Sequence, residues 1–294
     1  MNGTMHEILK VCPERIRNSL EKIENRDAEK IREIRIRCGS PICINIAGRT
    51  AFCGAFGMTD SPNKAILPYP DEIKIFYEKI CRNSIYSFSE QIKNGYIPIS
   101  GGHRIGLLGT AVLSGGEVEG IREVSGFVIR TAHEIMGCCD GLYGKICDAK
   151  SVKDTIIFAP PSGGKTTFLR DAARRLSLDG KSVCVIDERS ELFSVTDGTP
   201  AFDTGLGLDI LSGFPKAKGI QQALRTLSPQ VIICDEIGTE DEASEIVNAL
   251  GCGVSVIISA HADSEQALRK RPAIMKLEQS GAEWQFLKIT VPNE

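Results

Sequence analysis

The chain has 294 residues, of which 42% are hydrophobic and 25% are charged, and its formal net charge is −3 at pH 7. This length allows one large or two ordinary domains, and the composition is that of a globular protein rather than a disordered one. The mild acidity argues against a broad nucleic-acid-binding surface, so we expect no nucleic-acid partner.

Several of the eleven cysteines lie in apolar runs, as Cys184 and Cys234 do, and no C-x-x-C pair occurs. This pattern indicates small hydrophobic residues in a reducing cytosol. No run approaches the roughly twenty apolar residues that cross a bilayer, and the N-terminus is too polar for a signal peptide. We therefore expect a cytoplasmic chain that reaches a membrane only through partners.

The first part of the chain carries helical and strand-like patterns in turn. Residues 5–36 have apolar positions among charges and are predicted to be largely helical. Residues 42–46 and 50–56 are predicted to pair as a hairpin that turns at Gly48 and Arg49. Two helices are predicted to follow: 71–81 and 87–93.

Beyond residue 95 the pattern returns to strands around the loop 114–116. Three strands are predicted, over 96–99, 101–113 and 127–130, and one short helix is predicted over 142–147. We predict an α/β chain in two domains. A smaller α+β domain covers residues 1–140, and a domain with a mainly parallel sheet covers residues 141–294.

The segment 159–167, Ala-Pro-Pro-Ser-Gly-Gly-Lys-Thr-Thr, follows an apolar strand and opens an amphipathic segment that runs to about Leu178. Backbone N–H groups of a glycine-rich turn at a helix N-terminus form an anion cradle, with a lysine for the β- and γ-phosphates and a threonine for Mg²⁺. The chain is therefore predicted to bind a nucleoside triphosphate. The predicted binding residues are Pro160, Pro161, Ser162, Gly163, Gly164, Lys165, Thr166 and Thr167.

The motif asks for Gly where Ala159 stands, although Gly164, Lys165 and Thr166 fit it. Gly163 and Gly164 still allow the backbone to approach a phosphate closely. The substitution therefore weakens the match to the motif without removing the cradle.

The run 231–236, Val-Ile-Ile-Cys-Asp-Glu, is a buried-strand pattern that ends in two carboxylates. We expect Asp235 to hold Mg²⁺ together with Thr166. Glu236 is expected to orient and deprotonate the attacking water. This adjacent pair suits the activation of water and disfavours a small-molecule kinase.

Two further apolar runs end in polar residues, and the carboxyl ends of parallel strands gather at the ligand-binding edge of a sheet. The run 183–189 is expected to place Asp187 and Glu188 near the metal and the water. The run 254–261 is expected to place Ser259 and His261 at the same edge, where they can sense a γ-phosphate. Glu188 and His261 are therefore predicted to be catalytic, together with Glu236.

These motifs, with the stretches Glu33–Arg37 and Asn94–Gly109, resemble the stage III sporulation protein AA family over nearly the whole chain. That family is a sporulation-specific relative of the type II and type IV secretion and pilus ATPases. The resemblance implies that residues 141–294 form a RecA-like P-loop ATPase domain. It also implies an acidic box at Asp187-Glu188 and a histidine box at His261.

The same resemblance implies ATP and Mg²⁺ as cofactors and a homo-oligomeric, hexameric ring. It places the protein in the mother-cell cytosol of sporulating bacteria, at the channel that links mother cell and forespore. Its partners would be membrane proteins of that channel complex. An ATP-hydrolysing motor that powers assembly or transport there is the predicted function.

In such ATPases the nucleotide lies between the two domains, and an arginine of the N-terminal domain completes the pocket. A guanidinium near the γ-phosphate stabilises charge as the bond breaks. The candidates in this chain are Arg104, Arg122 and Arg130, of which Arg130 and Arg122 are preferred.

Two other functions stay open. The family usually has Gly at positions 159 and 162, where this chain has Ala and Ser, so a nucleotide-dependent scaffold or switch with little turnover is one alternative. A nucleic-acid motor is the other, but no aromatic stripe for stacking bases is visible.

Overall fold

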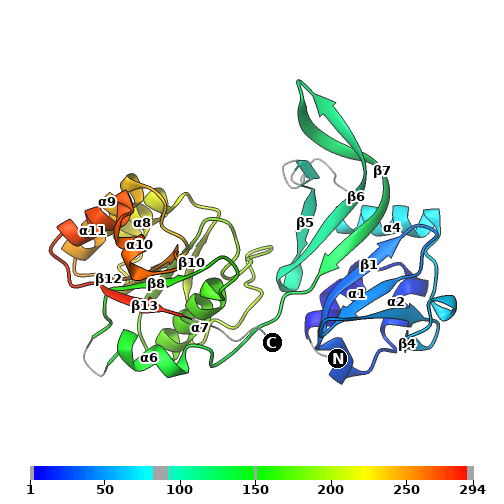
Figure 1. Cartoon of the computed structure of the whole chain (residues 1–294), viewed down its shortest axis with the longest axis horizontal. Helices are drawn as coiled ribbons and strands as arrows, with labels where there is room; N and C mark the ends of the chain where they lie inside the picture. The colour runs from blue at the N-terminus through cyan, green and yellow to red at the C-terminus, as the bar shows by residue number, and fades with distance from the viewer. Residues whose placement is uncertain (1–2, 82–91, 94, 149–150, 290–294) are drawn as a thin grey trace. The chain divides into compact units, whose positions relative to one another are not determined.

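The computed structural model describes residues 3–81, 92–93, 95–148 and 151–289. The chain divides into two compact units, Met1–His133 and Glu134–Glu294 (Figure 1). The predicted domain boundary lay a few residues further on, between residues 140 and 141. Most of the helix predicted over 87–93 lies outside the described residues.

The first unit is built on a seven-stranded sheet with the order β4-β3-β2-β1-β7-β6-β5, in which every neighbouring pair is antiparallel. Its strands are β1 (Ile31–Arg37), β2 (Cys43–Ile46), β3 (Arg49–Gly54), β4 (Gly57–Thr59), β5 (Tyr96–Ile99), β6 (His103–Ser114) and β7 (Glu117–Arg130). Within the described residues its α-helices include α1 (Gly3–Val11), α2 (Glu14–Leu20), α3 (Asn25–Ala28) and α4 (Pro70–Ile80). Two 3-10 turns complete it, η1 (Pro62–Lys64) and η3 (Ser100–Gly102).

The prediction that residues 5–36 are largely helical is wrong at its C-terminal end, where β1 begins at Ile31. Ile34 and Ile36 are fully buried, whereas Arg35 and Arg37 between and after them are exposed. Alternation with a period of two fits a strand that has one face on the core. The charges that suggested an amphipathic helix belong to the outer face of this strand.

The hairpin predicted around residue 48 is present, with Ile46 paired to Arg49. Its two turn residues are Ala47 and Gly48, which both have positive φ, at 47° and 83°. Two consecutive left-handed residues are typical of a tight turn that matches the twist of the flanking strands.

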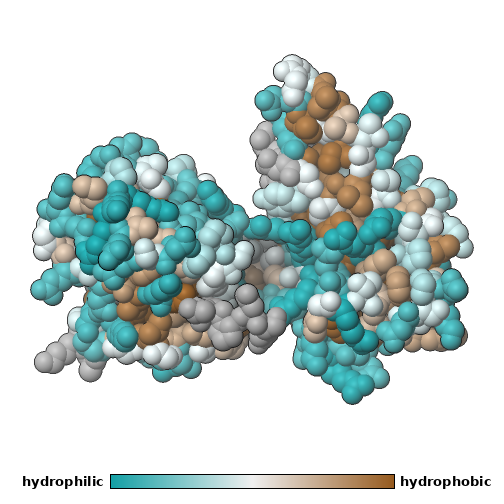
Figure 2. Space-filling view, viewed as in Figure 1, coloured by the Kyte–Doolittle hydropathy of each residue, from teal (hydrophilic) through white to brown (hydrophobic). Residues whose placement is uncertain are grey.

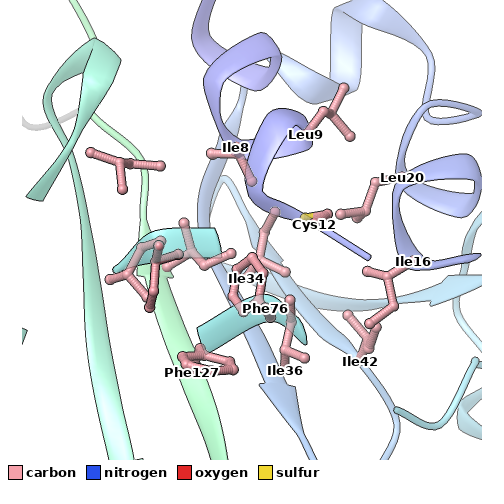
Figure 3. Close-up of a cluster of buried hydrophobic side chains, with 14 of the residues drawn as sticks. Ile8, Leu9, Cys12, Ile16, Leu20, Ile34, Ile36, Ile42, Phe76 and Phe127 are labelled. Carbon is pink, nitrogen blue, oxygen red and sulfur yellow. The ribbon is translucent and has the colours of Figure 1, made fainter. Parts of the chain in front are cut away.

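The core of the first unit lies between its helices and one face of the sheet (Figure 3). Phe76 of α4 meets Phe127 of β7 edge to face, with ring centres 4.5 Å apart, and both side chains are buried. Isoleucines of β1 pack beside them. The predicted helix 71–81 is therefore confirmed, and its apolar face covers the sheet.

Strands β6 and β7 form a long ribbon that turns at Gly115 and Gly116 and extends beyond the rest of the first unit (Figure 1). Most residues of its outer half are exposed, including Val112, Leu113 and Val118. Figure 2 shows hydrophobic residues along this ribbon.

The second unit is an α/β fold on a six-stranded parallel sheet with the order β10-β9-β11-β12-β8-β13. Its strands are β8 (Thr155–Ala159), β9 (Val183–Asp187), β10 (Asp209–Ser212), β11 (Val231–Cys234), β12 (Ser255–His261) and β13 (Gln285–Lys288). Its α-helices are α6 (Asp140–Ile146), α7 (Lys165–Leu178), α8 (Lys216–Thr226), α9 (Glu240–Gly251), α10 (Glu265–Arg269) and α11 (Pro272–Gln279).

Helices cover both faces of this sheet. One face packs against α8, α9, α10 and α11 through residues such as Ile186 and Ile258, whereas α7 is absent from that cluster and contacts β8, β9 and β12. Central strands covered on both sides are continuously apolar, which explains why all four residues of β11 are buried. The predicted mainly parallel sheet is confirmed, and its carboxyl edge carries the candidate site.

Within the described part of the chain, no helix has both the length and the apolar character that a bilayer span requires.

Candidate nucleotide site

The phosphate loop joins the end of β8 at Ala159 to the start of α7 at Lys165. Gly164 is the residue before the helix and has φ 81° and ψ 12°, a left-handed conformation that glycine adopts without strain. Ser162 also has a positive φ, at 60°, a conformation that glycine adopts more readily than serine. This turn sits at a helix N-terminus, where backbone N–H groups lack intrahelical partners and favour an anion.

Gly163 leaves no room for a side chain. A Cβ atom at this position would lie 2.6 Å from Cβ of Ala159 and 2.9 Å from the carbonyl oxygen of Pro160. The alanine at position 159 therefore makes glycine necessary at position 163. Because no side chain lies at this position, the loop backbone stays accessible as a cradle that fits a phosphate group.

Lys165 is buried at the base of this loop. Its ammonium nitrogen Nζ lies 2.7 Å from Nδ1 of His261 and 3.4 Å from the carbonyl oxygen of Pro160. Burial lowers the pKa of Lys165 from 10.5, although the charges of Asp235 and Glu236 act in the opposite direction. A buried ammonium group beside a backbone cradle is the arrangement expected for a phosphate ligand.

Asp235 follows β11 and lies against the first turn of α7. Its Oδ2 accepts a hydrogen bond from the Thr166 hydroxyl at 3.4 Å, and its Oδ1 accepts one from the Ser259 hydroxyl at 2.7 Å. Thr166 and Asp235 supply two oxygen ligands, which suits Mg²⁺ because this ion usually keeps waters and phosphate oxygens as its other ligands.

Glu236 is the next residue, and its carboxylate is partly exposed. Its Oε2 lies 3.4 Å from Nε2 of His261 and 3.9 Å from the guanidinium of Arg189. Residues 162–167 line a cavity of about 340 Å³ together with Asp235, Glu236, His261 and Arg189. The predicted phosphate loop, carboxylate pair and histidine thus meet at one cavity, at the carboxyl ends of β8, β11 and β12.

The expectation that Asp187 faces the metal is wrong. Its buried carboxylate accepts hydrogen bonds from the backbone N–H groups of Glu191, Leu192 and Phe193, at 2.8, 3.1 and 2.9 Å. Three backbone donors satisfy this carboxylate, so it shapes the turn after β9. Glu188 accepts a hydrogen bond from Nζ of Lys216 at 2.8 Å and does not line the cavity.

Arg170 of α7 holds the same turn from the other side. Its guanidinium donates to the carbonyl oxygens of Glu191 and Leu192 and lies 3.6 Å from the centre of the Phe202 ring. Burial lowers the pKa of Arg170 from 12.5 to about 10. The turn that places Arg189 and Glu191 at the cavity is thus fixed by contacts to α7.

The three arginine candidates lie on β6 and β7 of the first unit. Arg104 of β6 is paired in register with Arg130 of β7, and Arg130 lies 3.8 Å from Glu33 of β1. Arg122 is eight residues from Arg130 along β7, on the order of 25 Å at the usual rise per residue. One chain therefore cannot bring Arg130 and Arg122 to the same phosphate.

Sequence reasoning missed Arg189 and Glu191, which line the cavity, and Lys216, which lies outside it and holds Glu188. Arg189 follows the acidic pair directly, and its position next to a strand end was a usable signal. Lys216 gave no such signal, because its partners Glu188 and Glu242 are distant in the chain.

A family model described as "Sporulation stage III, protein AA" matches residues 3–291. The stage III sporulation protein AA of Bacillus subtilis (strain 168) is 34% identical over 291 residues, which are 97% of this chain and 91% of that protein.

Among solved structures, the ATPase DotB of Yersinia pseudotuberculosis has a TM-score of 0.56 at 16% identity, over 89% of this chain and 71% of that one. The pilus retraction motor PilT with bound ADP has a TM-score of 0.54 at 16% identity, over 86% and 70% of the two chains. At these identities the likeness concerns the fold, which confirms the predicted fold class of an α+β domain followed by a RecA-like α/β domain. From the family match over residues 3–291 and the relative that is 34% identical along nearly its full length, the chain belongs to the Sporulation stage III, protein AA family.

Proposed function

We propose that this protein is a Mg²⁺-dependent ATPase whose turnover drives a mechanical step in endospore formation. The observation that carries the proposal is the convergence on one cavity of the phosphate loop, a buried lysine and the carboxylates Asp235 and Glu236. Adjacent carboxylates at the end of a buried strand suit the hydrolysis of a bound nucleotide.

Each residue has a defined part in this proposal. The backbone of residues 160–167 surrounds the phosphates, and Lys165 neutralises the β- and γ-phosphate charge. Thr166 and Asp235 hold Mg²⁺, which supplies charge neutralisation at the phosphate oxygens when it is bound. Glu236 orients and deprotonates the attacking water, and His261 contacts both Lys165 and Glu236.

Two parts of the proposal rest on the family resemblance. One is a hexameric ring in which an arginine of the first unit, Arg130 or Arg122, reaches the γ-phosphate. The other is work at the mother cell–forespore channel, from the mother-cell cytosol and through membrane proteins of that complex. In this proposal Glu188 takes part in catalysis when its carboxylate separates from Lys216 on nucleotide binding.

The test is steady-state phosphate release by the purified protein with Mg·ATP, at a series of protein concentrations. Turnover should rise cooperatively with protein concentration if the ring is the active form, and it should vanish in Glu236→Gln. Equilibrium binding of ATP to Lys165→Ala is the second measurement, because this variant should lose affinity. Unchanged affinity would overturn the assignment of the phosphate loop.

A nucleotide-dependent switch is the alternative, and the strained, non-glycine residue Ser162 in the phosphate loop favours it. Tight ATP binding without phosphate release, in both the native protein and Glu236→Gln, would support the switch over the motor.

A further inference from the structure

The segment that carries Glu236, residues 235–239, is anchored to β12 through Ser259 and to α9 through Glu242. The N–H group of Glu236 donates to Oγ of Ser259 at 3.1 Å and to Oδ1 of Asp235. The N–H group of Ile237 donates to the carbonyl oxygen of Ser259 at 2.9 Å. The buried strand β12 therefore fixes the first half of this segment.

The N–H groups of the second half are held by Glu242. The N–H groups of Gly238 and Thr239 both donate to Oε2 of Glu242, at 2.8 and 3.0 Å. Glu242 is the third residue of α9, and its own N–H group donates to the hydroxyl oxygen of Thr239. A capping box of this kind normally holds a helix start. In this protein, the N-cap residue of that helix, Thr239, lies three residues after Glu236.

Lys216 in turn holds Glu242. The ammonium group lies 3.5 Å from Oε1 of Glu242 and 2.8 Å from Oε2 of Glu188, so one cation joins two carboxylates. Lys216 is only 8% exposed. Burial alone would lower the pKa of Lys216, but the hydrogen bond to Glu188 and the charge of Glu242 outweigh it and raise the pKa. Lys216 is therefore a charged residue at neutral pH.

From this geometry we infer that Lys216 is a positioning residue for Glu236, acting through Glu242. Neutralisation by Lys216 lets the Glu242 carboxylate stay beside Glu188 and accept from Gly238 and Thr239. Without the ammonium group, the two carboxylates repel each other in a partly buried site, and Glu242 leaves the backbone. The inference rests on the proposed hydrolytic role of Glu236.

The same contacts link the turn after β9 to the segment after β11. Glu188 begins the first of these, Lys216 begins α8, and Glu242 caps α9. A displacement of Glu188 is thereby passed to the segment that holds Glu236. This gives Glu188 a part in turnover even where its carboxylate does not touch the nucleotide.

The test compares Lys216→Met with Lys218→Met, a change of an exposed lysine two residues further along α8. ATP affinity, kcat for phosphate release and amide hydrogen exchange of residues 235–239 are measured for both. For Lys216→Met we expect kcat to fall roughly 100-fold, because a 1 Å misplacement of a catalytic group can cost that much. ATP affinity should change less than about threefold, and the Gly238 and Thr239 amides should exchange faster. Lys218→Met should match the native protein.

Two more variants separate positioning from a general loss of stability. Lys216→Arg keeps the charge and should retain more kcat than Lys216→Met. The double variant Lys216→Met/Glu242→Gln removes the repulsion while the glutamine oxygen still accepts from both N–H groups, so it should recover part of kcat. Native kcat and native exchange at residues 238–239 in Lys216→Met would overturn the inference, as would equal losses of kcat in Lys216→Met and the double variant.

The exchange measurement keeps the two proposals distinguishable. If the native protein releases no phosphate, the hydrolytic function fails. Faster exchange at Gly238 and Thr239 in Lys216→Met then still supports the anchoring of this segment by Lys216, and unchanged exchange refutes it.

Discussion

Nζ of Lys165 lies 2.7 Å from Nδ1 of His261, although 96 positions separate the two residues in the chain. An ammonium group can only donate, so Nδ1 of His261 accepts, and the ring proton is assigned to Nε2. Nε2 faces the carboxylate of Glu236 at 3.4 Å. The imidazole of His261 therefore connects Lys165, the residue proposed to meet the phosphates, with Glu236, the residue proposed to activate water.

Replacement of His261 by Ala should lower kcat for phosphate release by roughly 100-fold, the lower end of what proton-transfer and orienting groups contribute. ATP affinity should change little, because Lys165 is freed rather than removed. Phosphate release and equilibrium ATP binding are the two measurements. Asp263→Asn, an exposed change two residues away, is the control. A native kcat in His261→Ala would show that the contact between His261 and Glu236 has no part in turnover.

The phosphate loop should not tolerate Gly163→Ala, because the added Cβ would lie 2.6 Å from Cβ of Ala159. We expect ATP affinity to fall at least about tenfold, which corresponds to roughly 1.4 kcal/mol, measured by titration calorimetry. Gly141→Ala is the matched control, because its Cβ would meet nothing within 4 Å. Ala159→Gly added to Gly163→Ala removes the closer of the two clashes and should restore part of the affinity. Native affinity in Gly163→Ala would contradict this account.

The parts of the site that could be predicted from the sequence are those written in short local patterns. The phosphate loop and the following helix to Leu178 need only a glycine-rich turn between two apolar periodicities, and α7 ends where that pattern ends. The carboxylates after β11 follow four buried residues, so their place at the sheet edge was also predictable.

The rest of the fold and of the site depends on contacts between residues that are distant in the chain, and no local sequence pattern indicates them. Asp187 and Asp235 follow similar apolar runs, yet Asp187 turns back onto three backbone N–H groups and Asp235 faces Thr166. The sequence around Lys216 is typical of a surface lysine, but in the fold this residue lies between the carboxylates of Glu188 and Glu242. In the first unit, β1 was mistaken for helix because its charged outer face resembles the polar side of a helix.

Alanine substitutions at the three candidate arginines of the first unit should differ in whether their effects on kcat are additive. Arg104 and Arg130 are paired across β6 and β7, whereas Arg122 lies about 25 Å away along the strand. If Arg130 stabilises charge on the transferred phosphate, Arg130→Ala should lower kcat by roughly 1,000-fold, the lower end for such an arginine.

A double-variant comparison of kcat tests this arrangement. Arg104→Ala and Arg130→Ala should not be additive, because contacting residues share their effects, whereas Arg122→Ala and Arg130→Ala should be additive. Additive losses for the first pair, with coupling in the second, would show that Arg130 acts together with Arg122 rather than with Arg104.

Arg15 and Glu72 join α2 to α4 and should make the stability of the first unit depend on pH. Nε and Nη2 of Arg15 donate to the two oxygens of Glu72, at 2.9 and 2.6 Å, and the Tyr69 N–H group donates to the same carboxylate. Burial alone would raise the pKa of Glu72, but the hydrogen bonds from Arg15 and Tyr69 outweigh it and hold the pKa below 4.5.

A carboxyl group whose pKa is lower in the folded state stabilises the fold above its unfolded pKa, which is about 4.3, and loses this effect as the pH falls through the folded value. Glu72→Gln should therefore destabilise the first unit at pH 7 by about 1 kcal/mol, as a two-bond pair at a partly exposed site would. The difference from the native protein should shrink as the pH falls below about 4. Amide hydrogen exchange in α4 under increasing urea measures the stability of this unit by itself. Glu78→Gln, an exposed change on the same helix, is the control, and a Glu72→Gln effect that stays constant down to pH 3 would refute the role of the ion pair.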